Sequence, residues 1–400
     1  MQPFSRAADK ELQDLFRAER ELGAGDRAFV AETVYGVVRH LRSLMTLTQS
    51  SDSRALVLAA LVKYLGRNVR ELAPWVSESE ASQLAEIKAA DLGLLPPAVS
   101  AELPDWLYSR LSSIYPETEL SAMMRALNRP APLDLRVNTL LAERNEVLAQ
   151  LQAEGIAASA TPYSPFGIRL ASHPAINRHR LFLEGKVEVQ DEAGQLACVL
   201  VAPKPRDFVV DFCAGAGGKT LCLGALMRSH GRIYAFDVSA KRLAKFSPRL
   251  KRSGLSNVHV KVIESEAQVQ RLAGKIDRVL VDAPCSGLGT LRRNPDLKWR
   301  QSPQSVAELT QKQAAILQAA SRLVKDGGRL VYATCSILPE ENDAIVAGFL
   351  ESKTDFSLIA CGKILAGRQI PLDTGEMLRL FSHRHGTDGF FAAVIERRIT

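Results

Sequence analysis

From about Val187 onward, short apolar runs rich in β-branched residues alternate with segments of helical pattern. This alternation predicts a doubly wound α/β sheet, because parallel strands need crossover connections and these are usually helices. The predicted strands are Phe208–Phe212, Arg232–Asp237, Val258–Ile263, Arg278–Asp282 and Arg329–Thr334. Ligands of such sheets bind beyond the carboxyl ends of the strands, so the residues that follow each run are the first candidates for a site.

A glycine-rich turn follows the first predicted strand, with the sequence Asp211-Phe212-Cys213-Ala214-Gly215-Ala216-Gly217-Gly218-Lys219-Thr220. Three glycines there suit a backbone that approaches a ligand closely before a helix begins. The turn is not a P-loop, because Cys213 stands where the first glycine of GxxxxGK[ST] belongs, and this argues against phosphate binding. Asp237 ends the second strand, where a carboxylate can accept hydrogen bonds from both ribose hydroxyls of a nucleoside cofactor. These two features alone fit a dinucleotide or S-adenosylmethionine.

Two further strands are each followed by a cysteine. Cys285 lies in Asp282-Ala283-Pro284-Cys285-Ser286-Gly287, and Cys335 lies in Ala333-Thr334-Cys335-Ser336. If the two runs are neighbouring parallel strands, their ends lie about 5 Å apart and both thiols face one bound base. A nicotinamide enzyme has no use for this arrangement.

Cytosine C5 methylation does need two such groups. Carbon 5 is too poor a nucleophile to take a methyl group from a sulfonium, so a thiolate must first add to carbon 6. After methyl transfer a second group must remove the carbon 5 proton. Asp282 could hydrogen-bond ring nitrogen 3 as a carboxylic acid, which requires a raised pKa. The chemistry does not decide which of Cys285 and Cys335 is the nucleophile.

The N-terminal residues have a helical pattern. Asp26 is a plausible N-cap of a helix with apolar residues at helical spacing through Leu44, Ala55–Leu65 is apolar almost all round and should be central, and Leu84–Ala90 is a further segment. Leu94-Leu95-Pro96-Pro97 predicts a boundary. Beyond it, a helix over 103–115, strands at Leu133–Asn138 and Gly167–Leu170 and a helix over Glu143–Glu154 predict a small α+β module.

Composition narrows the setting of the protein. A net charge of +7 and a pI near 9.1 favour a polyanionic partner such as RNA. The apolar run Ala55–Val62 is far shorter than the roughly 20 residues of a membrane span, so we expect no membrane segment and a cytoplasmic location. The six cysteines include no CxxC pair, so we expect neither a disulfide framework nor a metal site.

Several motifs resemble those of the RNA 5-methylcytosine methyltransferases of the Sun/Nop type, in particular the bacterial ribosomal RNA methyltransferase B (Fmu) branch. The resemblance covers nearly the whole chain. Its motifs are Leu135-Arg136-Val137-Asn138-Thr139, Val189-Gln190-Asp191-Glu192-Ala193, the Cys213–Lys219 loop, Asp282–Gly287 with Arg292-Arg293-Asn294-Pro295-Asp296, Thr334-Cys335-Ser336 and Gly386-Thr387-Asp388-Gly389-Phe390-Phe391. Asp26–Val30 with Val34–Arg39 resembles a shortened NusB-like helical domain.

The resemblance implies a Rossmann-like class I S-adenosylmethionine-dependent methyltransferase domain over 181–400. An α+β module similar to an RNA-recognition motif would occupy 96–180, and the NusB-like domain 1–95. It implies that Cys335 is the nucleophile, that Cys285 assists product release, and that Asp282 and Lys219 complete the active site. The cofactor residues would be Cys213, Ala214, Gly215, Ala216, Gly217, Gly218, Lys219, Asp237, Asp282 and Glu264, the last where the family usually has Asp.

We expect RNA contacts at Arg136, Asn138, Arg292, Arg293, Lys298 and Arg300, and a monomeric protein. The favoured substrate is 16S ribosomal RNA. The alternatives are a transfer RNA cytosine-5 methyltransferase and a catalytically idle RNA-binding assembly factor. A small-molecule or protein methyltransferase would have no use for two thiols. A DNA enzyme would carry a target-recognition segment after Cys285, where none is evident.

Overall fold

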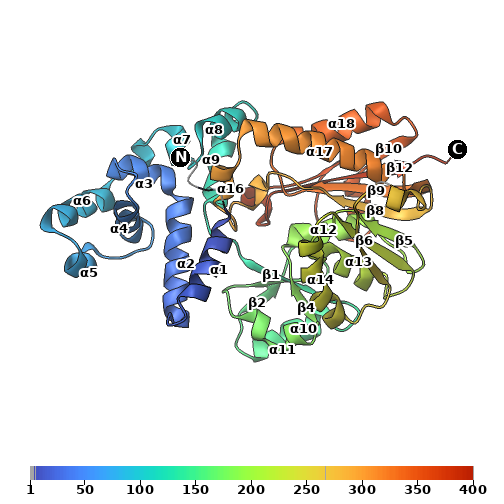
Figure 1. Ribbon diagram of the computed structural model, residues 1–400, viewed down its shortest axis with the longest axis horizontal. Helices are drawn as coiled ribbons and strands as arrows, with labels where there is room; N and C mark the ends of the chain where they lie inside the picture. The colour runs from blue at the N-terminus through green and yellow to red at the C-terminus, as the bar shows by residue number, and fades with distance from the viewer. Residues whose placement is uncertain (1–3, 5, 266, 400) are drawn as a thin grey trace. The chain divides into compact units, whose positions relative to one another are not determined.

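The computed structural model describes residues 4, 6–265 and 267–399 (Figure 1). The chain forms two compact units. Unit 1 comprises Met1–Pro130 together with Thr290–Pro303, and unit 2 comprises Ala131–Gly289 together with Gln304–Thr400. The segment Thr290–Pro303 is therefore separated in sequence from the rest of unit 1.

Unit 1 is helical. Its α4 carries five buried residues and packs at the centre, as predicted for the run from Ala55. Asp26 is not an N-cap, because α2 begins earlier and the Asp26 carboxylate accepts the Gly23 N–H from the third helical position. The helices are α1 (Ala8–Ala18), α2 (Ala24–Arg39), α3 (Leu41–Thr48), α4 (Ser53–Lys63), α5 (Val69–Leu72), η1 (Ala73–Trp75), α6 (Glu78–Ala89), η2 (Leu92–Leu94), α7 (Pro97–Ser100), α8 (Asp105–Ser112), α9 (Glu117–Leu127) and α16 (Leu297–Arg300).

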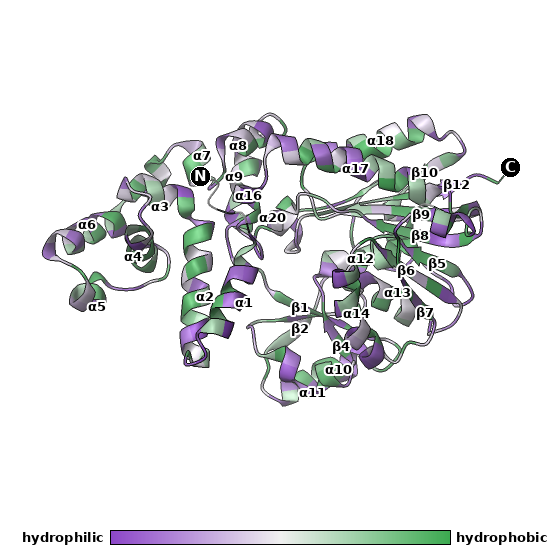
Figure 2. Ribbon diagram, viewed as in Figure 1, coloured by the Kyte–Doolittle hydropathy of each residue, from purple (hydrophilic) through white to green (hydrophobic). Residues whose placement is uncertain are grey.

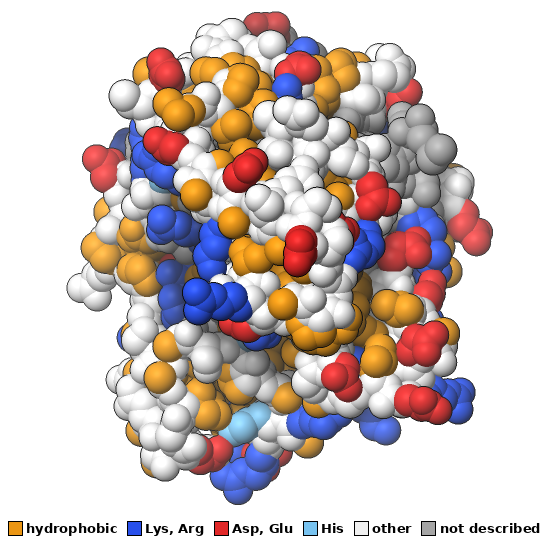
Figure 3. All heavy atoms as spheres, turned by 90° about the vertical axis from the view of Figure 1, so that its left-hand side faces the viewer, with side chains coloured by type: hydrophobic (Ala, Val, Ile, Leu, Met, Phe, Trp, Pro, Cys, Tyr) orange, Lys and Arg blue, Asp and Glu red, His pale blue; other side chains and the backbone are white. Residues whose placement is uncertain are grey.

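Some apolar side chains of unit 1 stay exposed, among them Trp75 and Leu94. Figure 3 shows apolar and charged side chains interspersed on the face that it presents. Such single exposed apolar residues are ordinary on a protein surface.

Lys298 of α16 is completely buried within unit 1. Its ammonium donates to the Arg39 carbonyl oxygen at 2.8 Å and to Asn128 Oδ1 at 3.1 Å. The neighbouring Trp299 Nε1–H donates to the Val38 carbonyl at 2.8 Å. Burial lowers the pKa of Lys298 to about 7. The α16 segment is therefore pinned to α2 and α9 by polar contacts.

This burial corrects two predicted RNA contacts. Lys298 has no exposed surface to offer a phosphate, and Arg292 is only 7% exposed. Arg293 is partly buried, while Arg300 is exposed and pairs with Asp296 at 3.2 Å. Of the predicted cluster, only Arg293 and Arg300 keep accessible side chains.

Unit 2 contains two sheets. The smaller is antiparallel, with strand order β2-β3-β1-β4, and it bears out the predicted α+β module in its strands and in α10. Its elements are β1 (Leu133–Val137), α10 (Arg144–Ala153), β2 (Ala158–Ala160), β3 (Gly167–Leu170), η3 (Ile176–Arg178), α11 (Arg180–Leu183) and β4 (Val187–Val189).

The larger sheet has the order β10-β12-β9-β8-β5-β6-β7, with β11 paired to β12. Strands β7, β6, β5, β8 and β9 are parallel. β12 runs antiparallel beside β9, and β10 is antiparallel to β12, so β10 has the same direction as the parallel strands. The elements are β5 (Phe208–Asp211), β6 (Arg232–Asp237), β7 (Val258–Val262), β8 (Ile276–Asp282), β9 (Val324–Thr334), β10 (Phe356–Ile359), β11 (Leu378–Leu380) and β12 (Phe390–Arg397). The predicted Rossmann-like architecture is confirmed, and β6 has the predicted bounds.

Helices cover both faces of this sheet (Figure 1). One face packs against α17 and α18, and the other against α12, α13 and α19. Successive side chains of a strand point to opposite faces of the sheet. Val279 and Val281 of β8 therefore lie in the core with α17 and α18, whereas Leu280 lies in the core with α12, α13 and α19. A smaller core joins α14 with α13 and β6. Figure 2 shows the central strands as predominantly hydrophobic. The helices are α12 (Glu192–Val201), α13 (Gly218–Leu226), α14 (Ala240–Ser253), α15 (Ala267–Gln270), η4 (Leu288–Thr290), α17 (Pro303–Ser321), η5 (Pro339–Glu341), α18 (Asp343–Ser352), α19 (Cys361–Ala366) and α20 (Ser382–His385).

Helix α12 joins the two sheets of unit 2. Nine of its ten residues are buried, and its apolar side chains share one core with Leu135 and Ile168 of the small sheet and Val331 of the large one. The strands of the predicted 96–180 module therefore pack with the methyltransferase domain, while α7, α8 and α9 pack with unit 1. The domain boundaries at 95 and 180 stay a prediction.

The buried Lys298 makes stability depend on pH. An unfolded lysine has a pKa near 10.5, so between pH 7 and 10.5 the unfolded chain binds more protons than the folded chain, and stability rises with pH. We expect unit 1 to gain about 2 kcal/mol from pH 7 to pH 9 through this group, and Lys298→Met to lose that gain. Urea unfolding followed by tryptophan fluorescence measures it, because all three tryptophans lie in unit 1. An equal rise in both proteins would contradict the assignment.

Candidate active site

The two motif cysteines lie side by side at the ends of adjacent parallel strands. Register pairs Asp282 at the end of β8 with Ala333 of β9. Cys285 and Cys335 each follow these positions by two or three residues, and their Sγ atoms are 3.4 Å apart. The predicted juxtaposition of two thiols is thus present in the fold.

The two thiols are electrostatically unequal. The hydrogen bond between Cys285 and Cys335, together with burial and the nearby charge of Cys335, raises the pKa of the Cys285 thiol well above its usual range. This shift favours the protonated form of the Cys285 thiol. Both side chains are partly exposed, so a ligand can reach them.

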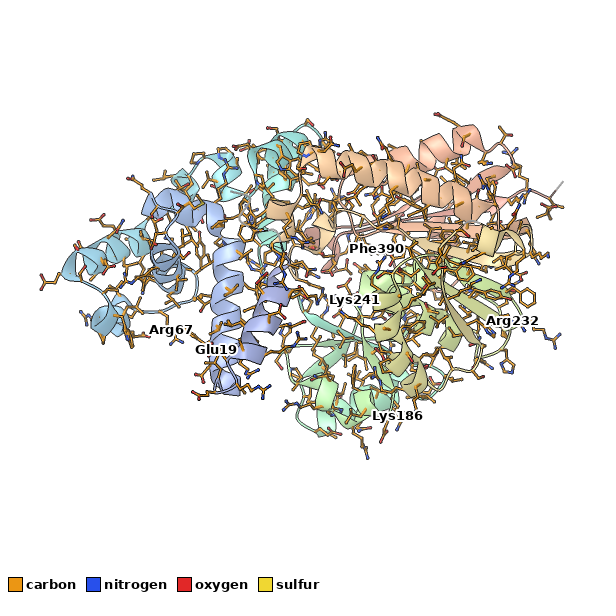
Figure 4. All side chains as sticks on the ribbon, in the orientation of Figure 1. Glu19, Arg67, Lys186, Arg232, Lys241 and Phe390 are labelled. Atoms are coloured by element: carbon orange, nitrogen blue, oxygen red, sulfur yellow. The ribbon has the colours of Figure 1, made fainter. Side chains whose placement is uncertain are left out.

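Lys219 and Asp282 form an ion pair at the same sheet edge. The Lys219 ammonium donates to Asp282 Oδ2 at 2.6 Å. Burial opposes the charged ammonium, but the charge and hydrogen bond of Asp282 outweigh it and raise the pKa of Lys219. The ammonium also lies 5.5 Å from the ring centroid of Phe390, which begins β12 and is labelled in Figure 4. The side chain is thus fixed as a cation between the glycine loop and the strand ends.

The glycine loop joins β5 to α13. Gly215 and Gly217 have φ values of 55° and 82°, and a Cβ at Gly217 would lie 2.0 Å from the Phe246 ring. Both the positive φ value and the close Phe246 ring require glycine at position 217. Its neighbours Cys213, Ala214, Ala216 and Gly218 belong to the same turn, and burial raises the pKa of the Cys213 thiol, which favours a packing role over a reactive one.

Asp237 braces this loop from the end of β6. The Gly215 N–H donates to Asp237 Oδ2 at 2.9 Å, and the Ser239 N–H donates to Oδ1 at 2.7 Å. Arg242 Nη2 also donates to Oδ1, at 2.9 Å. The next residue, Val238, is 69% exposed. A buried carboxylate beside an exposed apolar side chain suits the ribose and the base of a nucleoside.

Glu264 is less fixed. It follows β7, its side chain is exposed, and its N–H donates to Gln268 Oε1 at 3.3 Å. A role beside an adenine ring stays a prediction for this residue.

Sequence reasoning gave no role to Asp211, which the structure places beneath the loop. Asp211 is buried, and Thr220 Oγ1 donates to its Oδ2 at 2.6 Å. Burial raises the pKa of Asp211 to about 7. Asp211 is the last residue of β5 and precedes the Thr220 hydroxyl of α13 by nine residues, and this spacing was the signal in the sequence that could have predicted the contact. The residue ties the strand to the helix that carries Lys219.

Arg136 and Asn138 need a correction as RNA contacts, because both are buried. Arg136 Nη1 donates to the Gly218 carbonyl at 2.8 Å, and Asn138 Nδ2 donates to the carbonyls of Gly185 and Ser253 at 3.0 and 2.9 Å. These side chains hold the small sheet against the glycine loop and α14 instead.

Among the described residues, no cluster of three or more His, Cys, Asp or Glu side chains has the arrangement of a metal site. In the same residues, no helix combines the length and apolar character that crossing a membrane requires.

The contact between the thiols makes them a candidate pair for oxidation. Under diamide, we expect the wild-type protein to lose two titratable thiols as Cys285 and Cys335 give up two electrons and two protons to form a disulfide. Cys285→Ser and Cys335→Ser should each prevent this loss, and thiol titration with peptide mapping measures it. A wild-type protein whose cross-link involves other cysteines would contradict the geometry.

Known families match most of this fold. The family described as 16S rRNA methyltransferase RsmB/F matches residues 198–396, and a ferredoxin-like domain of RsmF/B-like methyltransferases matches residues 103–177. The solved structure of PH0851 is 28% identical, with a TM-score of 0.79, and the match covers 96% of this chain and 93% of that one.

Two relatives match at nearly full length. The probable ribosomal RNA small subunit methyltransferase B of Synechocystis sp. is 33% identical, with 98% of this chain and 94% of that protein covered. The ribosomal RNA small subunit methyltransferase B of Klebsiella pneumoniae is 32% identical, with 95% and 92% covered. Together with the paired cysteines and the glycine loop, these similarities show that the chain belongs to the RsmB/F family of 16S rRNA methyltransferases.

Proposed function

We propose that this protein transfers a methyl group from S-adenosylmethionine to carbon 5 of a cytosine in 16S ribosomal RNA. The observation that carries the proposal is the 3.4 Å contact between Cys285 and Cys335 beside the Lys219–Asp282 ion pair. Two thiols at one sheet edge supply the nucleophile and the base that this reaction needs and that other methyl transfers do not.

Cys335 is the nucleophile in this proposal. Its thiolate adds to carbon 6 of cytosine, the S–C6 bond forms, and the electron pair of the C5=C6 bond becomes available at carbon 5 for the methyl group. The raised pKa of Cys285 supports this order, because it favours a protonated Cys285 thiol, which is a poor nucleophile. Lys219 supplies positive charge that offsets the negative charge of the adduct, and Asp282 is the candidate contact for ring nitrogen 3.

Addition also prepares the base. Once Cys335 is bonded to carbon, its hydrogen bond and its charge no longer raise the pKa of Cys285, while burial and the charge of Glu341 still do. In the proposed order Cys285 then loses its proton to solvent. The Cys285 thiolate then takes the carbon 5 proton, the S–C6 bond breaks, and Cys335 leaves as a thiolate. The cycle restores both cysteines and releases the methylated base, the cofactor without its methyl group and one proton.

The cofactor residues fit a nucleoside with a sulfonium. S-adenosylmethionine supplies an electrophilic methyl group when it is bound. The buried Asp237 carboxylate suits ribose hydroxyls, the exposed Val238 suits an apolar base face, and the loop 213–218 allows close backbone approach. Asp282 and Lys219 close the side nearest the thiols. Glu264 is proposed only as a further contact on the adenine side.

A transfer RNA substrate and a catalytically idle RNA-binding factor are the alternatives, and the intact thiol pair argues against the second. RNA contacts at Arg293 and Arg300, a cytoplasmic location and a monomeric state belong to the proposal as well.

Replacing each cysteine separates their roles. We expect Cys335→Ala to lower methyl transfer to 16S RNA by at least about 1,000-fold, since no nucleophile remains. Cys285→Ala should instead accumulate a covalent protein–RNA adduct, because addition and methylation proceed but elimination stalls. Labelled cofactor and denaturing gels measure both effects.

The double variant Cys285→Ala/Cys335→Ala is the control, and it should give no shifted band. Turnover by Cys335→Ala, or an adduct in the double variant, would count against the nucleophile assignment.

Asp237 gives a separate test of the cofactor site. Asp237→Asn keeps the shape of the side chain but removes the charge that accepts three donors, so the Kd for S-adenosylmethionine should rise about 10- to 100-fold. Isothermal calorimetry measures this Kd, and filter binding should show unchanged RNA affinity. The reverse pattern would move the cofactor site elsewhere.

A further inference from the structure

A completely buried carboxylate lies behind the two cysteines. Glu341 ends the short helix η5, and its side chain has no exposed surface. The N–H of Ser286 donates to Glu341 Oε1 at 2.8 Å, and the hydroxyls of Ser286 and Ser336 both donate to Oε2. Ser286 directly follows Cys285, and Ser336 directly follows Cys335. One side chain therefore holds both cysteine-bearing loops.

Glu341 is itself fixed by the surrounding elements. Gln313 of α17 donates one amide to Glu341 Oε1 and to the Pro284 carbonyl, both at 3.0 Å. The Tyr332 hydroxyl of β9 donates to the Glu341 main-chain carbonyl at 2.6 Å. The carboxylate thus sits at a set position relative to the strand that leads to Cys335.

Burial of a carboxylate is expensive unless hydrogen bonds satisfy it. Here the four donors come from the two cysteine loops and from α17, and none comes from water-exposed side chains. An apolar residue could fill the space but could not fix the position of two loops through directional bonds. The arrangement is therefore better explained by alignment than by stability.

We propose that Glu341 is a positioning residue that holds the Cys285 and Cys335 loops in register, so that both thiols reach the same pyrimidine ring. The purpose of this alignment rests on the proposed function, but the alignment itself is present in the protein without substrate. The charge of Glu341 also contributes, after the contact with Cys335 and burial, to the raised pKa of Cys285.

A second link joins the loops without Glu341. The Gly289 N–H donates to the Cys335 carbonyl at 2.9 Å, and the Gly389 N–H donates to the Gly289 carbonyl at 2.8 Å. A Cβ at Gly289 would lie 2.1 Å from the Gly389 oxygen, so only glycine permits this approach. Loss of Glu341 should consequently let the loops pivot about this contact rather than separate.

The rate of Cys285–Cys335 disulfide formation under diamide measures the alignment without RNA or cofactor. We expect Glu341→Ala to slow this reaction at least about tenfold, because both serine hydroxyls lose the carboxylate that accepts from them and keep only their contact with each other at 3.2 Å. Glu341→Gln should stay within about threefold of wild type, since an amide of the same shape can still accept from Ser286 N–H and donate to a hydroxyl. The same order of variants should appear in kcat for methyl transfer, with the RNA KM nearly unchanged.

Two further variants keep the result interpretable. Asp343→Asn removes a partly exposed carboxylate two residues away, which pairs with Arg379, and should leave the cross-linking rate unchanged. If Glu341→Ala does not fold, Ser286→Ala/Ser336→Ala removes the same hydroxyl links and should slow cross-linking instead. A folded Glu341→Ala protein, or a folded double serine variant, that cross-links at the wild-type rate would overturn the proposal. If Glu341→Ala slows cross-linking but the wild-type protein itself methylates no RNA, the alignment is upheld and the proposed function is overturned.

Discussion

The parallel pairing of β8 with β9 is the constraint on which the site depends. Neither strand carries both cysteines, and the two lie fifty residues apart in the chain. The register that sets Asp282 opposite Ala333 brings the two loops to the same point of the sheet edge. A one-residue slip in the pairing would turn every side chain of β9 to the other face of the sheet. Val331 and Ala333 are buried on one face and Tyr332 on the other. Their burial therefore fixes the register and, through it, the positions of the two thiols.

Around this pair, the small sheet braces the cofactor loop. Arg136 donates to the Gly218 carbonyl, and Arg249 of α14 bridges the Ala216 carbonyl and Glu188 of β4. The two arginines thus find their partners inside unit 2, and their hydrogen bonds fix the orientation of the loop that leads to Lys219. The shared core through α12 explains why the small sheet and the methyltransferase sheet form one compact unit.

The sequence predicts the strands and the thiol pair well because both depend on local signals. β-branched runs define β5 to β8 within two residues, whereas β9 begins five residues before its predicted start. The motif after each strand marks its carboxyl end. The fates of Lys298, Arg136 and Asn138 could not be predicted in this way. Their partners are main-chain carbonyls and an amide that lie from 47 to 259 residues away, and a basic residue looks the same in a sequence whether it meets solvent or a carbonyl. Glu341 was missed for the same reason, since its partners come from three separate segments.

Bisulfite sequencing of ribosomal RNA tests the central claim most directly, in cells that lack this gene and carry either the wild-type protein or Cys335→Ala. The account predicts that one cytosine of 16S RNA stays unconverted only when the wild-type protein is present. An identical pattern in both strains, with no difference in 16S RNA, would contradict it.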